Sequence, residues 1–187
     1  AQEKTELTAE LFKIEQYVEM VLSYLRLESP SSDLVIRRQP LLPIVKHAVR
    51  KYAPLFIRKR LALALDVDES CMVLTDEKWL AFVIEQILSN ALKYTASGSI
   101  HIYMERPMTL VIEDTGMGIA AEDLPRLFEK GFTGYNGRED KRATGLGLYL
   151  SRRILRRLGH TISLDSQEGK GTRVRIGLDT AQIHTRE

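Results

Sequence analysis

The chain has 187 residues, of which 44% are hydrophobic and 28% charged, so it has the composition of a folded globular protein rather than a disordered one. Its formal net charge is only +2, which argues against a nucleic-acid partner bound through bulk charge. A single cysteine, Cys71, excludes an internal disulfide framework and a multi-cysteine metal site, and no apolar run is long enough to cross a membrane.

Residues 3–28 are predicted to form one long helix. Six apolar residues recur along it at alternating intervals of four and three: Leu7, Leu11, Ile14, Val18, Val21 and Leu25. This heptad spacing is typical of a helix that packs along a second helix. We therefore interpret residues 1–29 as half of a helical hairpin that pairs with a second subunit. Packing on the chain's own domain is the alternative.

Residues 30–180 are predicted to form a second domain, followed by a tail at 181–187. Apolar patterns predict strands at 34–37, 61–66, 72–74, 99–105, 108–113, 161–166 and 172–178. They predict helices at 40–56, 76–94, 124–128 and 146–158. Strands alternate with helices, but two pairs of strands read as hairpins. We therefore expect an α+β fold, a two-layer sandwich of one mixed sheet with helices on one face.

The apolar run before Asp114 predicts that this acid ends a buried strand. Gly116 and Gly118 follow it, and neither has a Cβ atom to keep a ligand away from the backbone. With Ile119 after them, these residues would suit a flat polar base, because a carboxylate accepts a hydrogen bond from an exocyclic amine. Taken alone, the motif is more simply explained as a turn after a strand.

Asn90 and Lys93 share one face of the helix predicted at 76–94, which ends at Tyr94. An amide oxygen can bind Mg²⁺, a lysine can bind phosphate, and a tyrosine ring can line a ribose or base. A polar helix end without function is the alternative.

A second glycine-containing segment opens the helix predicted at 146–158: Thr144, Gly145, Leu146, Gly147 and Leu148. Glycines there expose unpaired amides at the positive end of the helix dipole, which suits phosphate oxygens. A dinucleotide-binding fold is excluded, since no buried strand leads into these glycines. The turn at 169–172, which ends at Thr172, allows another close approach, although a hairpin loop explains it as well. Between these motifs, residues 129–144 are polar and aperiodic, as in a lid.

In their order along the chain, these segments resemble the N, G1, F, G2 and G3 boxes of the catalytic domain of sensor histidine kinases. The matching segments are 90–94, 114–118, 127–132, 145–148 and 169–172. The resemblance covers about residues 34–178, and residues 3–28 resemble the second helix of the family's dimerisation hairpin. The sequence of residues 129–138 is similar to that of intramembrane-sensing kinases that respond to cell-envelope antibiotics.

The resemblance implies a site for ATP and Mg²⁺. Asp114 would accept from the adenine amine, in a pocket shaped by Gly116 and Gly118. Asn90 would bind Mg²⁺ and Lys93 a phosphate. The other implied nucleotide-binding residues are Tyr94, Ile119, Phe132 as the lid anchor, Thr144, Gly145, Leu146, Gly147, Leu148 and Thr172, with the amides of 145–147 directed to the phosphates.

The sequence departs from related proteins at two positions. Related ATP hydrolases carry a glutamate base four residues before the metal-binding asparagine, where this chain has Gln86. Glu85 precedes it but faces about 100° away on a helix. Many histidine kinases have an arginine after the aromatic residue of the F box, where this chain has Thr133.

Either Lys130, Arg138 or Arg142 therefore supplies the positive charge opposite the transferred phosphoryl group, or none of them does, and the sequence does not choose among these alternatives. No histidine here fits the family's acceptor pattern of a histidine followed by an acid on a helix, since His47, His101, His160 and His184 are followed by Ala, Ile, Thr and Thr. We expect the acceptor to precede residue 1.

We therefore expect the ATP-binding domain of a sensor histidine kinase, in which the γ-phosphoryl group of Mg-ATP passes to a histidine and then to a response regulator. The expected partners are a second copy of the chain, a receiver domain and a transporter or other membrane protein, and no nucleic acid. The expected location is the cytoplasmic side of a plasma-membrane protein. The alternatives are an ATP-hydrolysing conformational switch, a serine/threonine kinase that inhibits a partner, and a non-catalytic interaction module.

Overall fold

The computed structural model describes residues 2–28, 34–134 and 144–179, and the fold divides into two units at residues 33 and 34. The first unit contains helix α1 (Gln2–Glu28), which confirms the predicted long helix. Five of its six heptad positions are exposed: Leu7, Leu11, Ile14, Val18 and Leu25. Among the described residues, no helix is both long and apolar enough to cross a membrane.

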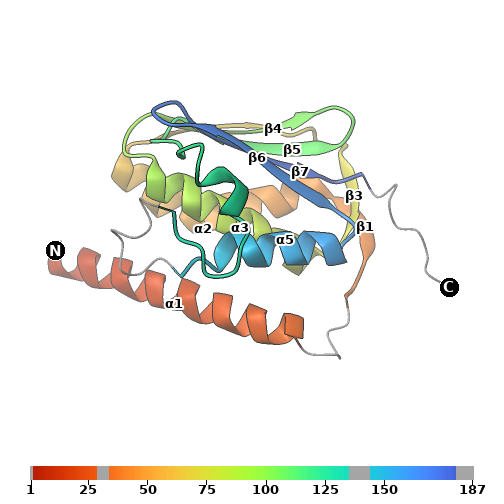
Figure 1. The fold of residues 1–187 in the computed structure, drawn as a ribbon, viewed down its shortest axis with the longest axis horizontal. Helices are drawn as coiled ribbons and strands as arrows, with labels where there is room; N and C mark the ends of the chain where they lie inside the picture. Colours follow the sequence, from red (N-terminus) through yellow and green to blue (C-terminus); the bar gives the residue numbers. More distant parts are fainter. Residues whose placement is uncertain (1, 29–33, 135–143, 180–187) are drawn as a thin grey trace. The chain divides into compact units, whose positions relative to one another are not determined.

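The second unit contains the sheet and the other helices (Figure 1). Its elements in chain order are β1 (Arg37–Pro40), α2 (Leu41–Lys59), β2 (Ala62–Asp66), β3 (Met72–Thr75), α3 (Glu77–Tyr94), β4 (Ser99–Glu105), β5 (Thr109–Asp114), the 3₁₀ helix η1 (Leu124–Arg126), α5 (Gly147–Arg157), β6 (Thr161–Gln167) and β7 (Gly171–Gly177). The element types agree with those predicted from the apolar patterns.

Five strands form one mixed sheet in the order β2-β4-β5-β7-β6. β2 runs parallel to β4, and the other neighbours are antiparallel. Helices α2, α3 and α5 cover one face of this sheet (Figure 1). The predicted α+β sandwich is therefore confirmed.

The prediction of a single sheet was wrong in one respect, because β1 and β3 form a separate two-stranded antiparallel sheet. The first strand also lies at Arg37–Pro40 and not at 34–37. Its position is set by pairing with β3, while the backbone amide of Val35 donates instead to the carboxylate of Asp76 at 2.8 Å.

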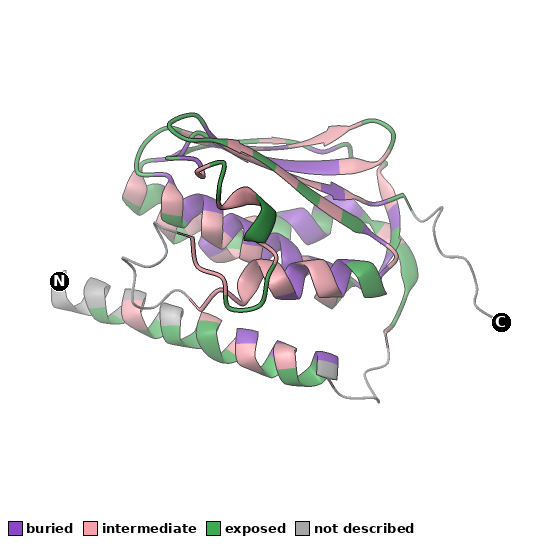
Figure 2. Cartoon of the chain, viewed as in Figure 1, coloured by how far each residue is buried: buried purple, intermediate pink, exposed green. Residues whose placement is uncertain are grey.

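The core lies between the sheet and the three helices, with buried side chains on the facing surfaces of both layers (Figure 2). Alternation along β5 turns Leu110, Ile112 and Asp114 toward the helices. Leu110 and Ile112 are fully buried apolar side chains, whereas Asp114 continues the same row as a carboxylate that is only 7% exposed. The pleat of β5 therefore brings one acid into the layer between sheet and helices.

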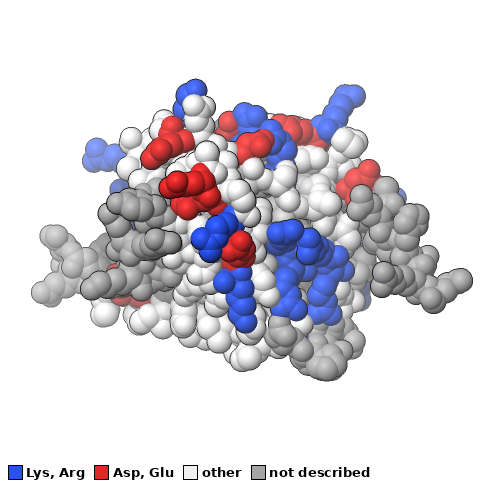
Figure 3. Space-filling model, in the orientation of Figure 1, with Lys and Arg blue, Asp and Glu red and all other residues white. Residues whose placement is uncertain are grey.

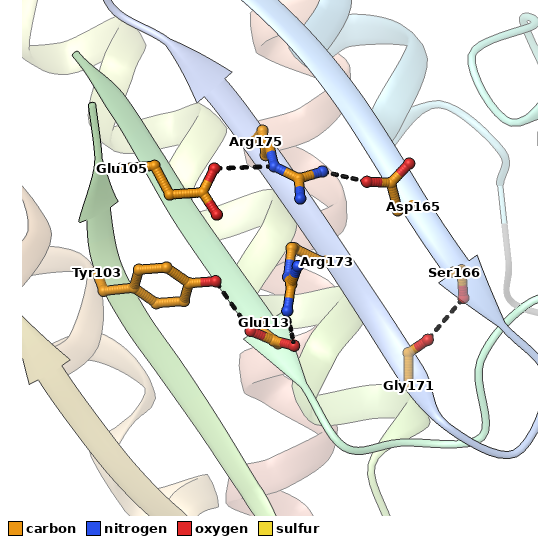
Figure 4. A network of polar contacts seen from close by, with 8 residues as sticks. All are labelled: Tyr103, Glu105, Glu113, Asp165, Ser166, Gly171, Arg173 and Arg175. Atoms are coloured by element: carbon orange, nitrogen blue, oxygen red, sulfur yellow. Dashed lines mark hydrogen bonds and ion pairs between the residues drawn. The ribbon is translucent and has the colours of Figure 1, made fainter. Parts of the chain in front are cut away.

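The outer face of the sheet is polar (Figure 4). Arg173 contacts Glu113 at 2.7 Å, and the Tyr103 hydroxyl donates to the same carboxylate. This pairing with Arg173 lowers the pKa of Glu113. Arg175 likewise forms ion pairs with both Glu105 and Asp165. The outer face is thus occupied by its own ion pairs, which leaves the inner row and the strand ends for a ligand.

Both ends of α3 are fixed by side chains. Asp76 caps its start by accepting from the amide of Trp79 at 3.2 Å. At its end, the Lys59 ammonium donates to the carbonyl oxygens of Leu92 and Thr95. Lys59 is available there because α2 continues through Pro54 to Lys59, three residues beyond the predicted end.

Candidate functional site

Asp114 is the buried acid around which the site is built. Its carboxylate accepts a hydrogen bond from the amide of Gly116 at 2.8 Å. Burial raises the pKa of Asp114, while the amides of Gly116 and Thr172 and the nearby Thr95 hydroxyl act in the opposite direction. The Thr95 hydroxyl is buried without a well-aligned partner among the described residues. The acid is held in one orientation and can still accept from an incoming donor.

Gly116 and Gly118 are required by the chain's own packing. A Cβ atom on Gly116 would lie 2.5 Å from the carbonyl oxygen of Tyr94 and 2.7 Å from the carboxylate of Asp114. Gly118 has φ +69°, and a Cβ atom there would lie 2.0 Å from the carbonyl oxygen of Gln167. The segment after β5 is therefore packed between the end of α3 and the β6–β7 turn, so three of the predicted motifs meet around Asp114.

The last two turns of α3 carry the predicted metal and phosphate residues. Asn90 is half-buried, and its side-chain amide has no hydrogen-bond partner among the described residues. Lys93 is exposed, and its ammonium lies 4.9 Å from the centre of the half-buried Tyr94 ring. The end of this helix contacts the loop after Asp114, since the amide of Met117 donates to the carbonyl oxygen of Tyr94 at 3.1 Å.

The glycines before α5 contact the F-box segment. Gly145 has φ +62°, and a Cβ atom there would lie 2.4 Å from the backbone carbon of Gly131 and 2.5 Å from the carbonyl oxygen of Phe132. The amide of Gly131 also donates to the Gly145 carbonyl. The Leu146 amide donates to the Thr144 hydroxyl oxygen at 3.3 Å, and Leu148 lies in the first turn of α5, which begins at Gly147. The start of the lid is thereby attached to the start of α5.

Arginine side chains hold the lid's aromatic residues. Arg126 stacks on the Phe132 ring at 4.5 Å and pairs with Glu129 at 3.0 Å. Arg152 stacks on Phe128 at 5.5 Å. α5 carries four arginines and no acidic residue, and Lys and Arg side chains gather over it in Figure 3.

An open pocket of about 230 Å³ lies at the lid and not at Asp114. Lys130, a predicted lid charge, lines it together with Arg126, Phe132 and Thr133. Arg138 and Arg142, the other two candidates, lie outside the described residues. Sequence reasoning missed Arg126, whose signal was its spacing of three from Glu129 on a helical turn.

Gln86 and Glu85 point to different parts of the molecule, as helical geometry predicted. A Cβ atom on Gly147 would lie 3.0 Å from the amide oxygen of Gln86, so Gln86 faces the start of α5. Glu85 is 7% exposed and pairs with Lys51 of α2 at 2.6 Å. The position that holds a base in related hydrolases therefore faces the glycines, but it carries a neutral amide.

A family model described as histidine kinase-, DNA gyrase B- and HSP90-like ATPase matches residues 75–182. The chain belongs to this ATPase family. Within it, the chain is the ATP-binding catalytic domain of the sensor histidine kinase type found in two-component signalling.

Several sensor kinases are similar in sequence to this chain. It is 33% identical over 176 residues to the sensor histidine kinase YxdK of Bacillus subtilis, covering 91% of this chain and 54% of YxdK. It is 34% identical to the sensor histidine kinase GraS of Staphylococcus epidermidis, and the match covers 91% of this chain and 50% of GraS. It is 33% identical to the sensor protein BceS of Bacillus subtilis, and the match covers 90% of this chain and 51% of BceS. These matches agree with the subgroup expected from residues 129–138. The chain spans about half the length of these relatives.

Solved structures show the same fold at low identity. The full-length structure of ShkA in complex with AMPPNP has a TM-score of 0.73 at 20% identity, covering 94% of this chain and 38% of ShkA. The Acinetobacter baumannii histidine kinase AdeS has a TM-score of 0.70 at 23% identity, covering 94% and 83%. The ATPase-family sandwich expected from the motifs is confirmed.

Proposed function

We propose that this domain binds Mg-ATP through the residues described above, and that the whole protein transfers the γ-phosphoryl group to a histidine outside these 187 residues. A response regulator's aspartate would then take the phosphoryl group from that histidine. Within the enzyme, positioning and charge compensation would supply most of the catalysis of such a transfer.

One observation carries this proposal. The end of α3 contacts the Asp114 loop through Tyr94 and Gly116, while Gln86, two turns earlier on α3, faces Gly147 at the start of α5. Eight residues of helix separate these two points, which is about 12 Å at 1.5 Å per residue. A base-recognising acid and a phosphate-facing helix start separated in this way, with Asn90 and Lys93 between them, suit an extended nucleoside triphosphate.

Magnesium fits the donor that the chain offers. Asn90 offers an amide oxygen, and the described residues contain no cluster of three or more His, Cys, Asp or Glu side chains that could hold a metal by themselves. Mg²⁺ is commonly held by one or two protein oxygens together with phosphates and water. Asn90 would hold the ion, which would neutralise phosphate charge.

Hydrolysis of ATP is the alternative, and the surroundings of Gln86 argue against it. The side-chain amide of Gln86 cannot take a proton from water, and the neighbouring Glu85 forms an ion pair with Lys51. Transfer to a protein side chain needs no base at that position for water. A robust steady-state release of phosphate from the wild-type protein would favour the hydrolase and contradict our proposal.

The direct experiment has two steps. Isothermal titration calorimetry of residues 1–187 with ATP and Mg²⁺ should show binding, and its absence would favour a non-catalytic interaction module. Radiolabelled ATP should then leave residues 1–187 unlabelled, but should give an acid-labile phosphoprotein when the protein includes a preceding acceptor helix. Acid-labile labelling of residues 1–187 alone would contradict the proposal, and an acid-stable labelled partner would indicate a serine/threonine kinase.

The whole protein is further proposed to act as a homodimer on the cytoplasmic side of the plasma membrane, with a receiver domain and a membrane protein such as a transporter as partners. The exposed heptad residues of α1 support the dimer, since an apolar stripe of this kind needs a second helix. Light scattering of the wild type and of Leu11→Glu would test it, and equal monomer masses for the two would contradict it.

A further inference from the structure

Ser166 lies in one row with the two residues that flank the proposed base site. Asp114 pairs with Thr172 across β5 and β7, and Thr172 pairs with Ser166 across β7 and β6. Residues directly opposite in neighbouring strands present their side chains on the same face, so the three polar groups follow one another along the inner face. Ser166 belongs to none of the motifs recognised in the sequence.

The Ser166 hydroxyl has three polar neighbours. It accepts from the amide of Ile119 at 2.9 Å, and it lies 2.8 Å from the carbonyl oxygen of Gly171, a contact drawn in Figure 4. Its third neighbour is the Thr172 hydroxyl oxygen at 2.9 Å. The side chain thus joins the loop after β5 to both strands of the β6–β7 hairpin.

The direction of each hydrogen bond follows from the number of protons. A hydroxyl has one proton and two lone pairs, and a carbonyl oxygen can only accept. Ser166 therefore donates its proton to Gly171, and accepts from Ile119 and from Thr172. Because the Thr172 proton is directed to Ser166, the Thr172 oxygen has only lone pairs left for a ligand.

We propose that Ser166 is a positioning residue that makes the Thr172 hydroxyl an acceptor and so helps the site to select a 6-amino purine over a 6-keto purine. Asp114 is also an acceptor while it is ionised, so the row presents two acceptors side by side. An exocyclic amine, or a water that it orders, satisfies both, whereas a keto oxygen opposes both. This inference rests on the proposed function, because it assumes that the base lies at Asp114.

The test compares ATP with ITP, whose base has a keto group in place of the amine. We expect Ser166→Ala to weaken ATP binding roughly three- to tenfold, as for one lost neutral hydrogen bond, and to leave ITP binding within about twofold. Ser166→Thr keeps the hydroxyl and should retain the wild-type ratio of the two dissociation constants. Ser163→Ala is the matched control, since Ser163 is an exposed serine of the same strand.

Equal weakening of ATP and ITP by Ser166→Ala would indicate a merely structural role and would overturn the inference, as would no change in either. If Ser166→Ala does not fold by circular dichroism, Thr172→Val decides, because it removes the acceptor in a strand that favours valine. It should lower the ATP preference to the same extent, and an unchanged preference would overturn the inference. Failure of the wild type to bind ATP would overturn the proposed function and this inference together, whereas intact ATP binding with an unchanged ratio would overturn this inference alone.

Discussion

The carboxylate of Asp114 and the amide of Gly116 are joined by a buried hydrogen bond of 2.8 Å. This bond fixes the orientation of the carboxylate and uses one lone pair of its Oδ1 atom. The remaining lone pairs can accept from a ligand. It also explains why the loop after β5 tolerates no side chain at Gly116. The role of Asp114 is therefore recognition of the base, and its replacement should affect binding before it affects the fold.

Asp114→Asn should lower ATP affinity by roughly tenfold or more, because a hydrogen bond to a charged acceptor is lost and an amide donor faces the base amine. Calorimetry with Mg-ATP would measure this. Glu113→Gln is the matched control, since Glu113 lies on the same strand but on the outer face, where it pairs with Arg173. Unchanged ATP affinity in Asp114→Asn would refute the assignment of the base site.

Gly145→Ala should loosen the lid from α5, because its Cβ atom would lie within 2.6 Å of three backbone atoms of Gly131 and Phe132. We expect a larger loss of affinity for ATP than for adenosine, because the substitution would separate the start of the lid from the start of α5, which faces the phosphates. Gly169→Ala is the control. Its φ of +76° is equally unfavourable for alanine, but the space around it is open. Equal effects of the two substitutions on ATP binding would contradict the role of the Gly145 contact.

Lys51→Met should destabilise the fold by about 3 kcal/mol, because it leaves the buried Glu85 carboxylate without its partner at 2.6 Å. Urea unfolding followed by circular dichroism would measure the free energy of unfolding. The double variant Lys51→Met/Glu85→Leu should recover most of the loss, since it removes the stranded charge. A Lys51→Met protein as stable as the wild type would show that Glu85 has another source of compensation.

His160 should make stability depend on pH. Its ring is 2% exposed, and burial lowers its pKa from 6.5 to about 4. The unfolded chain therefore binds a proton at a higher pH than the folded one. This contribution to stability is fully present above pH 6.5 and is lost as the pH falls toward 4, by up to about 3 kcal/mol.

Urea unfolding at several pH values between 4 and 7 would measure the slope due to His160. His160→Gln can keep the contact with the Thr75 hydroxyl, which lies 3.1 Å from the histidine ring, and should flatten the slope. His47→Gln, at an exposed position of α2, should leave it unchanged. An unchanged slope in His160→Gln would show that other groups produce the pH dependence.

Most helices and strands were predictable from the sequence because their signals are local. The Asp76 cap, the broad apolar face of α3 and the alternation in β4 and β5 each depend on residues a few positions apart. The motifs around Asn90, Asp114 and Gly145 were recognisable for the same reason, since their residue types and order are properties of the chain. The separation of Gln86 from Glu85 also followed from helical geometry alone.

The tertiary structure decided the contacts between distant segments. The pairing of β1 with β3, the capping of α3 by Lys59 and the pair between Lys51 and Glu85 join residues more than 30 positions apart, and no local pattern specifies them. The same holds for Ser166. The alternation of residues along β6 indicates that its side chain lies on the inner face, but it does not indicate that Ile119 and Thr172 are its neighbours. The sequence by itself thus determined the elements and the family motifs, while strand register and helix packing decided which polar groups meet and in which direction their hydrogen bonds run.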